Sequence, residues 1–240
     1  MRDMEDKHWW FASRREILKS VLQQGLKLTK MNNGCLKLME IGCGSGANFP
    51  VLSGYGELHG VDISETMVAC ASKKCLANSV SIGSLPCNLG ITEISEFDLI
   101  FCGDVLEHVK EDVSSLVSIR ERLRRGGILI IFVPAFSWLW SENDVRSHHY
   151  RRYSRTYLST ILESAGFKIK RMSYFNSLLF VPIFLAQKIK SFFKLSFDEV
   201  AFRPGFLNNM LRYIFSSEAF WLKHVNFPVG YSLMAIAVKN

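Results

Sequence analysis

Residues 38–49, LMEIGCGSGANF, decide the fold that the rest of the chain builds around them. An apolar run ends here in three glycines, Gly42, Gly44 and Gly46. Glycines at such a point let a strand turn sharply into a helix, and they let the backbone approach a ligand with no Cβ in the way. The loop also satisfies the G-x-G-x-x-A pattern of dinucleotide-binding proteins, which alone is a weak signal. The stretch therefore predicts a strand, a ligand-binding loop and a helix in succession.

Apolar, strand-like runs and amphipathic helical stretches alternate on both sides of this loop. The run at residues 128–133 is apolar throughout, which predicts a central strand with both faces covered. Strands that alternate with helices predict a parallel, doubly wound sheet. We expect strands at residues 36–41, 58–63, 97–102, 128–133, 167–173 and 231–238.

Helices are expected between these strands. One covers residues 8–30, and Ser64 caps another that runs to about Ala77. Ser154 caps a third, which ends at Gly166. A further helix is expected to end at the glycines 126–127, and its apolar face is predicted to hold Val113, Leu116, Val117 and Leu123.

Composition sets broad limits on the chain's partners and surroundings. The 240 residues carry a net charge of +7, a surplus that favours anionic partners without choosing among them. Six cysteines form no C-x-x-C pair and several lie in apolar runs, as expected of small buried residues in a reducing compartment. The opening residues, MRDMEDKHWW, lack the apolar core of a signal peptide, which predicts a cytoplasmic protein.

One uncharged stretch, residues 172–187, complicates that interpretation, because lysines and further aromatic residues follow it. A membrane-spanning helix needs roughly 20 apolar residues, and this stretch is shorter and contains Asn176 and Pro182. We interpret it as a buried helix or lid. The alternative is a segment that rests on lipid headgroups at the inner face of the membrane, which its basic flank favours.

Two acids beside the glycine loop indicate the type of nucleotide. Asp62 closes the second strand, 20 residues after Gly42, where a carboxylate can accept hydrogen bonds from both ribose hydroxyls. Glu40 stands immediately before the loop. An acid there suits a cofactor with a cationic amino-acid end, such as S-adenosylmethionine, and is unfavourable beside a pyrophosphate. A nicotinamide oxidoreductase is therefore the weaker alternative.

At this point the chain resembles the class I S-adenosylmethionine-dependent methyltransferases. The motifs EIGCGSG, GVDIS, FDLIFCGDVLEHV and LRRGGILIIFVPA follow one another in that family's order. The segments HWWFASRREIL and ENDVRSHHYRRYS resemble a branch that acts on small molecules. The resemblance implies an α/β, Rossmann-like, seven-stranded sheet with an antiparallel last strand.

The resemblance also implies roles by position. Glu40 and the glycine loop hold the methionine end, Asp62 binds the ribose, and Ile63 packs on the adenine. Many relatives have an acid where Ser81 stands, in the segment that closes over the adenine. The expected cofactor-binding residues are Glu40, Gly42, Cys43, Gly44, Gly46, Asp62, Ile63, Met67, Ser81, Ile82, Cys102 and Gly103.

The motif GDVLEHV places Asp104, Glu107 and His108 at the carboxyl end of the fourth strand, where open α/β sheets bind ligands. In one interpretation His108 lines the methyl-transfer site and orients the acceptor or takes its proton. In the other, these residues and a later histidine bind a divalent metal, since some similar O-methyltransferases use a related acid-x-x-Glu-His arrangement. A third interpretation is that these side chains only pack. We expect the first, without a metal.

The loop after the fifth strand crosses the same edge of the sheet and contains SHHYRRYSR, residues 147–155. A base such as His149 is useful for an oxygen acceptor, and Asp144 could orient it. The alternative is that these side chains cap the loop and bridge to solvent. The expected catalytic residues are Asp104, His108, His149 and Tyr153.

The chain is expected to be a single methyltransferase domain. Its parts are an N-terminal helical cap at 1–33, a cofactor-binding core at 34–173, a helical lid at 174–228 and a closing strand at 229–240. The lid is predicted to wall the acceptor pocket together with Trp9 and Trp10, through its aromatic residues Tyr174, Phe175, Phe180, Phe184, Phe192, Phe193, Phe197, Phe202 and Phe206.

We expect methyl transfer to a hydroxyl or carboxyl oxygen of a small, partly apolar metabolite or a lipid- or glycan-linked acceptor. Nitrogen is the second choice of acceptor atom. Nucleic acid is not expected as a partner, because only one short basic cluster and no N-P-P-Y-like motif are present. A cofactor-binding module without activity remains a further alternative class.

Overall fold

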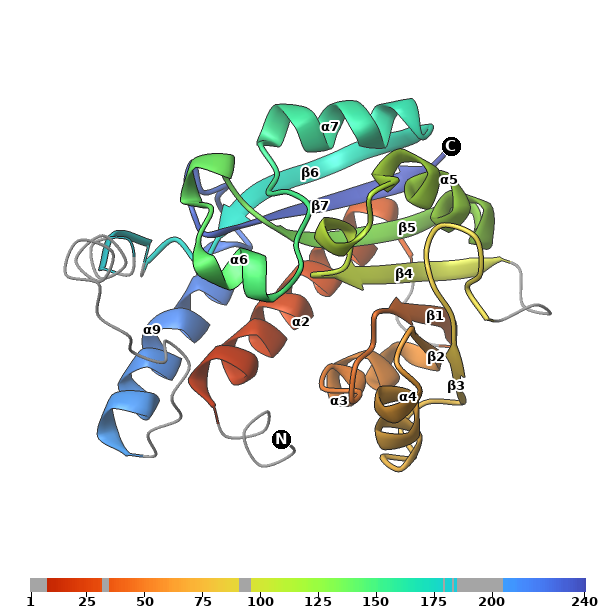
Figure 1. The fold of residues 1–240 in the computed structure, drawn as a ribbon, viewed down its shortest axis with the longest axis horizontal. Coiled ribbons are helices and arrows are strands. Elements are labelled where there is room, and N and C mark those ends of the chain that lie inside the picture. The colour runs from red at the N-terminus through yellow and green to blue at the C-terminus, as the bar shows by residue number, and fades with distance from the viewer. Residues whose placement is uncertain (1–7, 32–34, 91–95, 179, 183, 185–204) are drawn as a thin grey trace.

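The computed structural model describes residues 8–31, 35–90, 96–178, 180–182, 184 and 205–240. Its centre is a seven-stranded sheet in the order β3-β2-β1-β4-β5-β7-β6 (Figure 1). β1 to β5 run parallel to one another, and β7 runs antiparallel to both β5 and β6, which confirms the expected reversed last strand. The strands are β1 Leu36–Ile41, β2 Gly56–Asp62, β3 Ser79–Ile82, β4 Phe97–Gly103, β5 Leu123–Pro134, β6 Phe167–Phe175 and β7 Ser232–Lys239.

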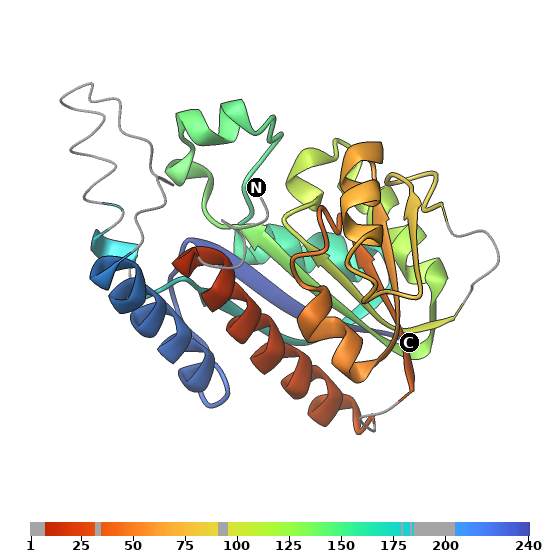
Figure 2. The same ribbon diagram turned by 90° about the horizontal axis from the view of Figure 1, so that it is seen from below.

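Helices cover both faces of this sheet. α5 and α7 lie on one face, and α2 and α9 lie side by side on the other (Figures 1 and 2). The α-helices are α2 Trp9–Thr29, α3 Phe49–Leu52, α4 Glu65–Ser72, α5 Asp112–Arg122, α6 Glu142–Arg146, α7 Arg155–Ser164 and α9 Phe206–Trp221. Short 3-10 helices are η1 Ser53–Tyr55, η2 Leu106–His108 and η3 Ser137–Leu139.

Two apolar clusters hold these layers together, one on each face of the sheet. In β5, Leu129 and Ile131 pack with α5 and α7, whereas Ile128 and Ile130 pack with α2. Successive side chains of a strand point to opposite faces, so both sets are needed to fill the two layers. This explains why residues 128–133 are apolar throughout.

Two predicted helix boundaries were wrong. α4 ends at Ser72 rather than near Ala77, and Cys75 then adopts a left-handed conformation (φ 52°) that a helix cannot continue through. α5 ends at Arg122, because Leu123 already pairs with Phe97 as the first residue of β5. The glycines 126–127 therefore lie inside a strand.

The buried face of α5 was also assigned incorrectly. Val113 and Val117 are each 38% exposed, while Leu116 and Ile119 are fully buried. Residues three and four positions apart share a helix face. The buried face holds Asp112, Ser115, Leu116 and Ile119, which is one residue earlier than predicted.

The insertion before the closing strand begins later than expected. Tyr174 and Phe175 belong to β6 and are core residues, so they cannot line a lid. Phe180 and Phe184 stack on each other and join a small cluster with Leu139. The predicted lid residues Phe192, Phe193, Phe197 and Phe202 fall outside the described part of the chain.

The N-terminal helix α2 is attached to the insertion as well as to the sheet. Trp9 and Trp10 both pack on Phe215 of α9, with ring centroids 4.9 and 5.5 Å away, and the Trp9 amide donates to the Asn208 side chain at 3.0 Å. The two indoles therefore join the N-terminal helical cap to the insertion. None of the helices that could be traced has both the length and the hydropathy to cross a membrane.

Candidate active site

The glycine loop turns between β1 and α3, next to the point where the strand order reverses between β1 and β4. Gly42, Gly44 and Gly46 all have positive φ angles. A Cβ on Gly42 would collide with Val105, and one on Gly46 would lie 2.7 Å from the Phe49 ring. A Cβ on Gly44 would meet nothing within 4 Å. The loop is therefore packed on its inner side and open at Gly44, where a ligand can approach the backbone.

Glu40, at the end of β1, is buried beneath this open side. Its Oε1 accepts a hydrogen bond from the Asn48 amide at 2.8 Å, whereas its buried Oε2 has no partner among the described groups. Burial raises the pKa of Glu40 to about 8, although the Asn48 hydrogen bond opposes the shift. A buried oxygen without a donor is costly, and the ammonium group of a methionine moiety would supply one.

Asp62, at the end of β2, is held by two backbone amides. Its Oδ2 accepts from Gly44 at 2.7 Å and its Oδ1 from Ser64 at 2.9 Å. Each carboxylate oxygen can accept a second hydrogen bond, so both stay available to ribose hydroxyls. Ile63 and Ile82, which are 74% and 52% exposed, offer apolar surface of the kind an adenine ring needs.

Ser81, Met67, Cys43 and Cys102 are also among the residues predicted to bind the cofactor. Ser81 places a hydroxyl where relatives have an acid. Its buried Oγ has no hydrogen-bond partner among the described residues. Met67 is half-buried in the first turn of α4. Cys43 and Cys102 are buried, and burial raises the pKa of both thiols, which keeps them protonated.

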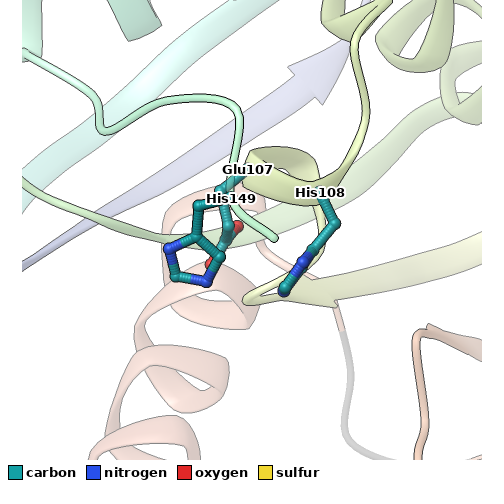
Figure 3. Close-up of side chains that lie close together, drawn as sticks. All are labelled: Glu107, His108 and His149. Carbon is teal, nitrogen blue, oxygen red and sulfur yellow. The ribbon is translucent and has the colours of Figure 1, made fainter. Parts of the chain in front are cut away.

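The acceptor end of the site gathers three side chains from two segments. Glu107 and His108 come from η2, and His149 comes from the loop that follows α6 (Figure 3). Each offers a ligand atom, and these atoms all lie within 4.8 Å of one another. The two imidazole rings meet edge to face with centroids 4.7 Å apart. The structure thus brings together two of the predicted catalytic residues, His108 and His149.

A charged network fixes the orientation of His149. Its Nδ1 lies 2.9 Å from the buried carboxylate of Asp144, which also accepts hydrogen bonds from Arg152 at 2.8 and 2.9 Å. Burial alone would raise the pKa of Asp144, but the hydrogen bonds from Arg152 and His149 outweigh it and lower the pKa. An ionised Asp144 can only accept, so Nδ1 carries a proton and Nε2 is the ring nitrogen left for other partners.

Burial shifts the pKa values of Glu107 and His108 in opposite directions. Glu107 is fully buried, and its pKa is raised well above the usual value, first by burial and then by the charge of Asp104. Its Oε2 has no partner in the described structure. Partial burial and the neighbouring His149 lower the pKa of His108. At neutral pH the pocket therefore presents a protonated Glu107 carboxyl group beside a neutral His108 imidazole.

Asp104 is tied to the N-terminal helix. It follows β4 with a left-handed backbone (φ 54°) and forms an ion pair with Arg14 of α2. The Arg14 guanidinium lies over the rings of Trp10, Phe132 and Phe175, 5.4 to 5.7 Å from their centroids. Asp104 therefore attaches α2 to the site, and that pairing leaves it less suited to act as a free base.

The prediction of a catalytic role for Tyr153 was wrong. Its side chain is fully buried, and its hydroxyl donates to the Leu106 carbonyl at 3.1 Å. Burial raises the pKa of Tyr153, so the phenol is not a base. Its ring instead holds η2 against the loop that carries His149.

Sequence reasoning missed three residues of the site. Asn48 follows the glycine loop, Arg14 lies one helical turn after Trp10, and Arg152 sits in the basic cluster beside His149. Asn48 and Arg152 each hold a carboxylate, and Arg14 pairs with Asp104. The spacing of Asn48 from Glu40 was the one available signal, because both lie on the same strand–loop–helix unit.

Comparison with known proteins fits this geometry. Residues 39–131 match the family described as "Methyltransferase domain", a span that contains Glu40, the glycine loop, Asp62, Glu107 and His108. The reversed seventh strand around them is the arrangement that the sequence motifs implied. Residues 39–131 are thus similar to a methyltransferase domain, and the fold around them is shared with a solved S-adenosylmethionine-dependent methyltransferase. The matched span includes the loop and both acids of the cofactor half.

Individual relatives of this methyltransferase domain differ in what they act on. The chain is 34% identical over 101 residues to a tRNA U34 carboxymethyltransferase of Shewanella piezotolerans, covering 39% of this chain and 30% of that protein. It is 28% identical over 138 residues to a ubiquinone biosynthesis O-methyltransferase of Glaesserella parasuis, covering 52% and 58%. The matches thus span 30% and 58% of the lengths of these two relatives.

A solved structure shares the fold of the domain. Phosphoethanolamine N-methyltransferase 2 of Haemonchus contortus, in complex with S-adenosyl-L-methionine, superimposes with a TM-score of 0.56 at 19% identity. The match covers 90% of this chain and 52% of that one.

Proposed function

We propose that the chain is a methyltransferase that uses S-adenosylmethionine to methylate a hydroxyl or carboxyl oxygen of a small, partly apolar acceptor. The observation that carries the proposal is the placement of His149, whose base nitrogen lies beside Glu107 and His108 at the carboxyl end of β4. A base at that position suits an acceptor whose proton is removed during transfer, such as a hydroxyl group.

The residues that would hold the cofactor have hydrogen-bond acceptors or apolar surface that a ligand can still use. Glu40 Oε2 would accept from the methionine ammonium group, Asp62 from the ribose, and Ile63 and Ile82 would pack on the adenine. When bound, the cofactor supplies an electrophilic methyl group on a sulfonium. Methyl transfer then needs chiefly an acceptor aligned in line at about 3 Å.

The acceptor's proton would pass to His149. Transfer would exchange the cofactor's sulfur–methyl bond for an oxygen–methyl bond. His149 Nε2 would take the hydroxyl proton, and Asp144 would stabilise the imidazolium. Glu107, kept protonated by burial, would donate a hydrogen bond that positions the oxygen. A carboxylate acceptor has no proton to lose, so for such an acceptor Glu107 would matter more than His149.

The surroundings favour a partly apolar acceptor. Trp138, 57% exposed, contacts Phe184 of the insertion with centroids 5.6 Å apart, next to the loop that carries His149. Similarity to an O-methyltransferase of ubiquinone biosynthesis supports an oxygen acceptor of that kind. Similarity to a tRNA carboxymethyltransferase supports RNA as the alternative.

The test is transfer of a tritiated methyl group from S-adenosylmethionine to fractions of cell extract. Lipid, small-molecule and RNA fractions are assayed separately, and the labelled product is identified by mass spectrometry. The proposal predicts an O-methylated small molecule or lipid-linked product. Label only in RNA, or only on nitrogen, would replace the acceptor assignment while leaving the cofactor assignment intact.

A second role for the same three side chains is to hold a divalent cation. The observation in its favour is the buried, unpartnered Oε2 of Glu107, which faces two imidazoles in a mixed N and O donor set. The hydrogen bond from His149 to Asp144 is also the support that metal-bound histidines usually have. Full turnover after treatment with a chelator would rule this role out.

A further inference from the structure

Helix α9 has an apolar stripe on its outer side. Phe206, Met210, Tyr213, Phe220 and Trp221 are 83%, 40%, 80%, 58% and 52% exposed. Spacings of four, three and seven residues place the first four on one face of the helix, and Trp221 is adjacent to Phe220. Contiguous exposed aromatic surface of this kind marks an interaction site more often than an isolated apolar residue does.

The opposite face of α9 is fully used in packing on α2. Phe215 is buried against Trp9, and Ser20 of α2 donates to the Ala219 carbonyl at 2.7 Å. Ser216 meets Ser13 at 3.3 Å. The helix is therefore held firmly with its aromatic stripe turned outward, and Figure 2 shows α2 and α9 side by side along one face of the molecule.

Charges beside the stripe are mostly basic. The exposed charged side chains of α2, α9 and the turn after α9 are Lys19, Lys27, Arg212 and Lys223 against a single acid, Glu16. The one acid of α9, Glu218, is buried and accepts from the Ser177 amide. Aromatic residues with a basic border match the headgroup region of an anionic bilayer, where indole and phenol rings are favoured.

The N-terminal end of the stripe lies close to the active site. The Trp9 amide at the start of α2 bonds to Asn208 in the first turn of α9, and Arg14, further along α2, pairs with Asp104. A surface contacted by this end of α9 would therefore be near the acceptor side of the site.

We propose that the outer stripe of α9 docks the protein on an anionic lipid surface. The aromatic side chains would enter the interfacial layer while the neighbouring lysines and arginines contact phosphate headgroups. The helix has 16 residues and its inner side is packed on α2, so it would lie on the surface rather than span it. The docking does not depend on the reaction proposed above, but it would place a lipid-linked acceptor within reach of the site.

Flotation of the purified full chain with vesicles tests the docking. Vesicles of phosphatidylcholine alone are compared with vesicles that also contain phosphatidylglycerol. The stripe variant is Phe206→Ser/Tyr213→Ser/Phe220→Ser, and its matched control is Val113→Ser/Val117→Ser on the opposite face of the sheet. The charge variant is Arg212→Glu/Lys223→Glu, with Arg125→Glu/Arg155→Glu as its control.

We expect the wild-type chain and both controls to float with the anionic vesicles only. The stripe variant should stay in solution, and the charge variant should bind at least about fivefold more weakly. Failure of the wild type to float, or equal flotation of the stripe variant, would overturn the proposal. So would a fall of several degrees in the melting temperature of the stripe variant, since the stripe would then be covered by the chain itself. A dimer of the wild type that the stripe substitutions dissociate would assign the surface to a second copy instead.

Discussion

The cofactor half and the acceptor half of the site are built in different ways. In the cofactor half, the hydrogen-bonded partners are near in sequence: Glu40 and Asn48 are 8 residues apart, and Gly44 and Asp62 are 18 apart. In the acceptor half, Arg14 reaches Asp104 across 90 positions, and the Tyr150 amide reaches the Glu107 carbonyl across the whole of β5. The first half is a local motif, whereas the second exists only once the sheet has formed.

Because the two halves are built from different segments, substitutions in one half should leave the property that depends on the other half unchanged. Substitutions beside β1 and β2 should change cofactor affinity, and substitutions in η2, the 147–152 loop or the insertion should change turnover or acceptor binding. A variant of one half that disturbed both properties equally would show that the halves are not independent.

The largest effect is expected for His149→Ala. Removing the base should lower kcat for a hydroxyl acceptor by about 10²- to 10⁴-fold, with the affinity for S-adenosylhomocysteine unchanged. Steady-state rates with the acceptor found in the screen provide the measurement. His148→Ala is the control, because His148 is exposed beside it and should leave kcat unchanged. Equal losses in both variants would argue for loop packing rather than proton transfer.

The next largest effect is expected for Asp62→Ala in the cofactor half. Losing charge-assisted hydrogen bonds to the ribose should weaken S-adenosylhomocysteine binding by about 2–4 kcal/mol, measured by calorimetry. Glu65→Ala, an exposed acid three residues away, is the control and should bind normally. Undiminished binding by the Asp62 variant would remove Asp62 from the site.

A pH effect should distinguish Glu40 from the other acids. With its pKa raised to about 8, Glu40 is protonated in the free protein at pH 7. Binding of the cofactor's ammonium group would favour the ionised form, so about one proton should be released per ligand bound at pH 7. Calorimetry in buffers of different ionisation enthalpy measures that number, and Glu40→Gln should abolish the release.

The same shift predicts how the free protein responds to pH. Because the folded-state pKa lies above the unfolded value, Glu40 contributes stability that is fully present below about pH 4.5 and is lost as pH rises through about 8. Denaturant unfolding of the wild type and Glu40→Gln across this window should show a difference in free energy that changes with pH. A constant difference would mean that Glu40 ionises normally.

The smallest effect is expected in the insertion. Phe180→Ser/Phe184→Ser should raise the acceptor KM about three- to tenfold, because contacts that stabilise the bound acceptor and the transition state equally are lost. The cofactor affinity should be nearly unchanged. Parallel loss of both affinities together with a lower melting temperature would identify the segment as ordinary core. Phe180 is buried beside Leu139 and Tyr231, so the melting temperature must be measured alongside.

The sequence predicted the cofactor half well because that half is local. Glycine positions, Glu40 and Asp62 follow from how one strand turns into one helix, and the alternation of strands and helices implies the sheet. Two predicted helix ends were wrong. The left-handed Cys75 follows the end of α4 before Ala77, and Leu123 pairs with Phe97 as a strand residue. Neither feature has a strong pattern in the sequence.

The acceptor half could be predicted only in part. The orientation of His149 by Asp144 was predicted correctly, because the two residues lie five positions apart on one short loop. Tyr153, in the same polar cluster, was assigned wrongly, since its burial depends on how the loop packs over η2. The pairing of Arg14 with Asp104 depends on a helix from the far end of the chain and could not be inferred from spacing.

The central claim is that Glu40, the glycine loop and Asp62 form a site for S-adenosylmethionine rather than for a dinucleotide. Calorimetric titration of the purified chain with S-adenosylhomocysteine and, separately, with NADH tests it most directly. The account predicts one bound S-adenosylhomocysteine per chain and no heat of binding from NADH. Binding of NADH without binding of S-adenosylhomocysteine would contradict it.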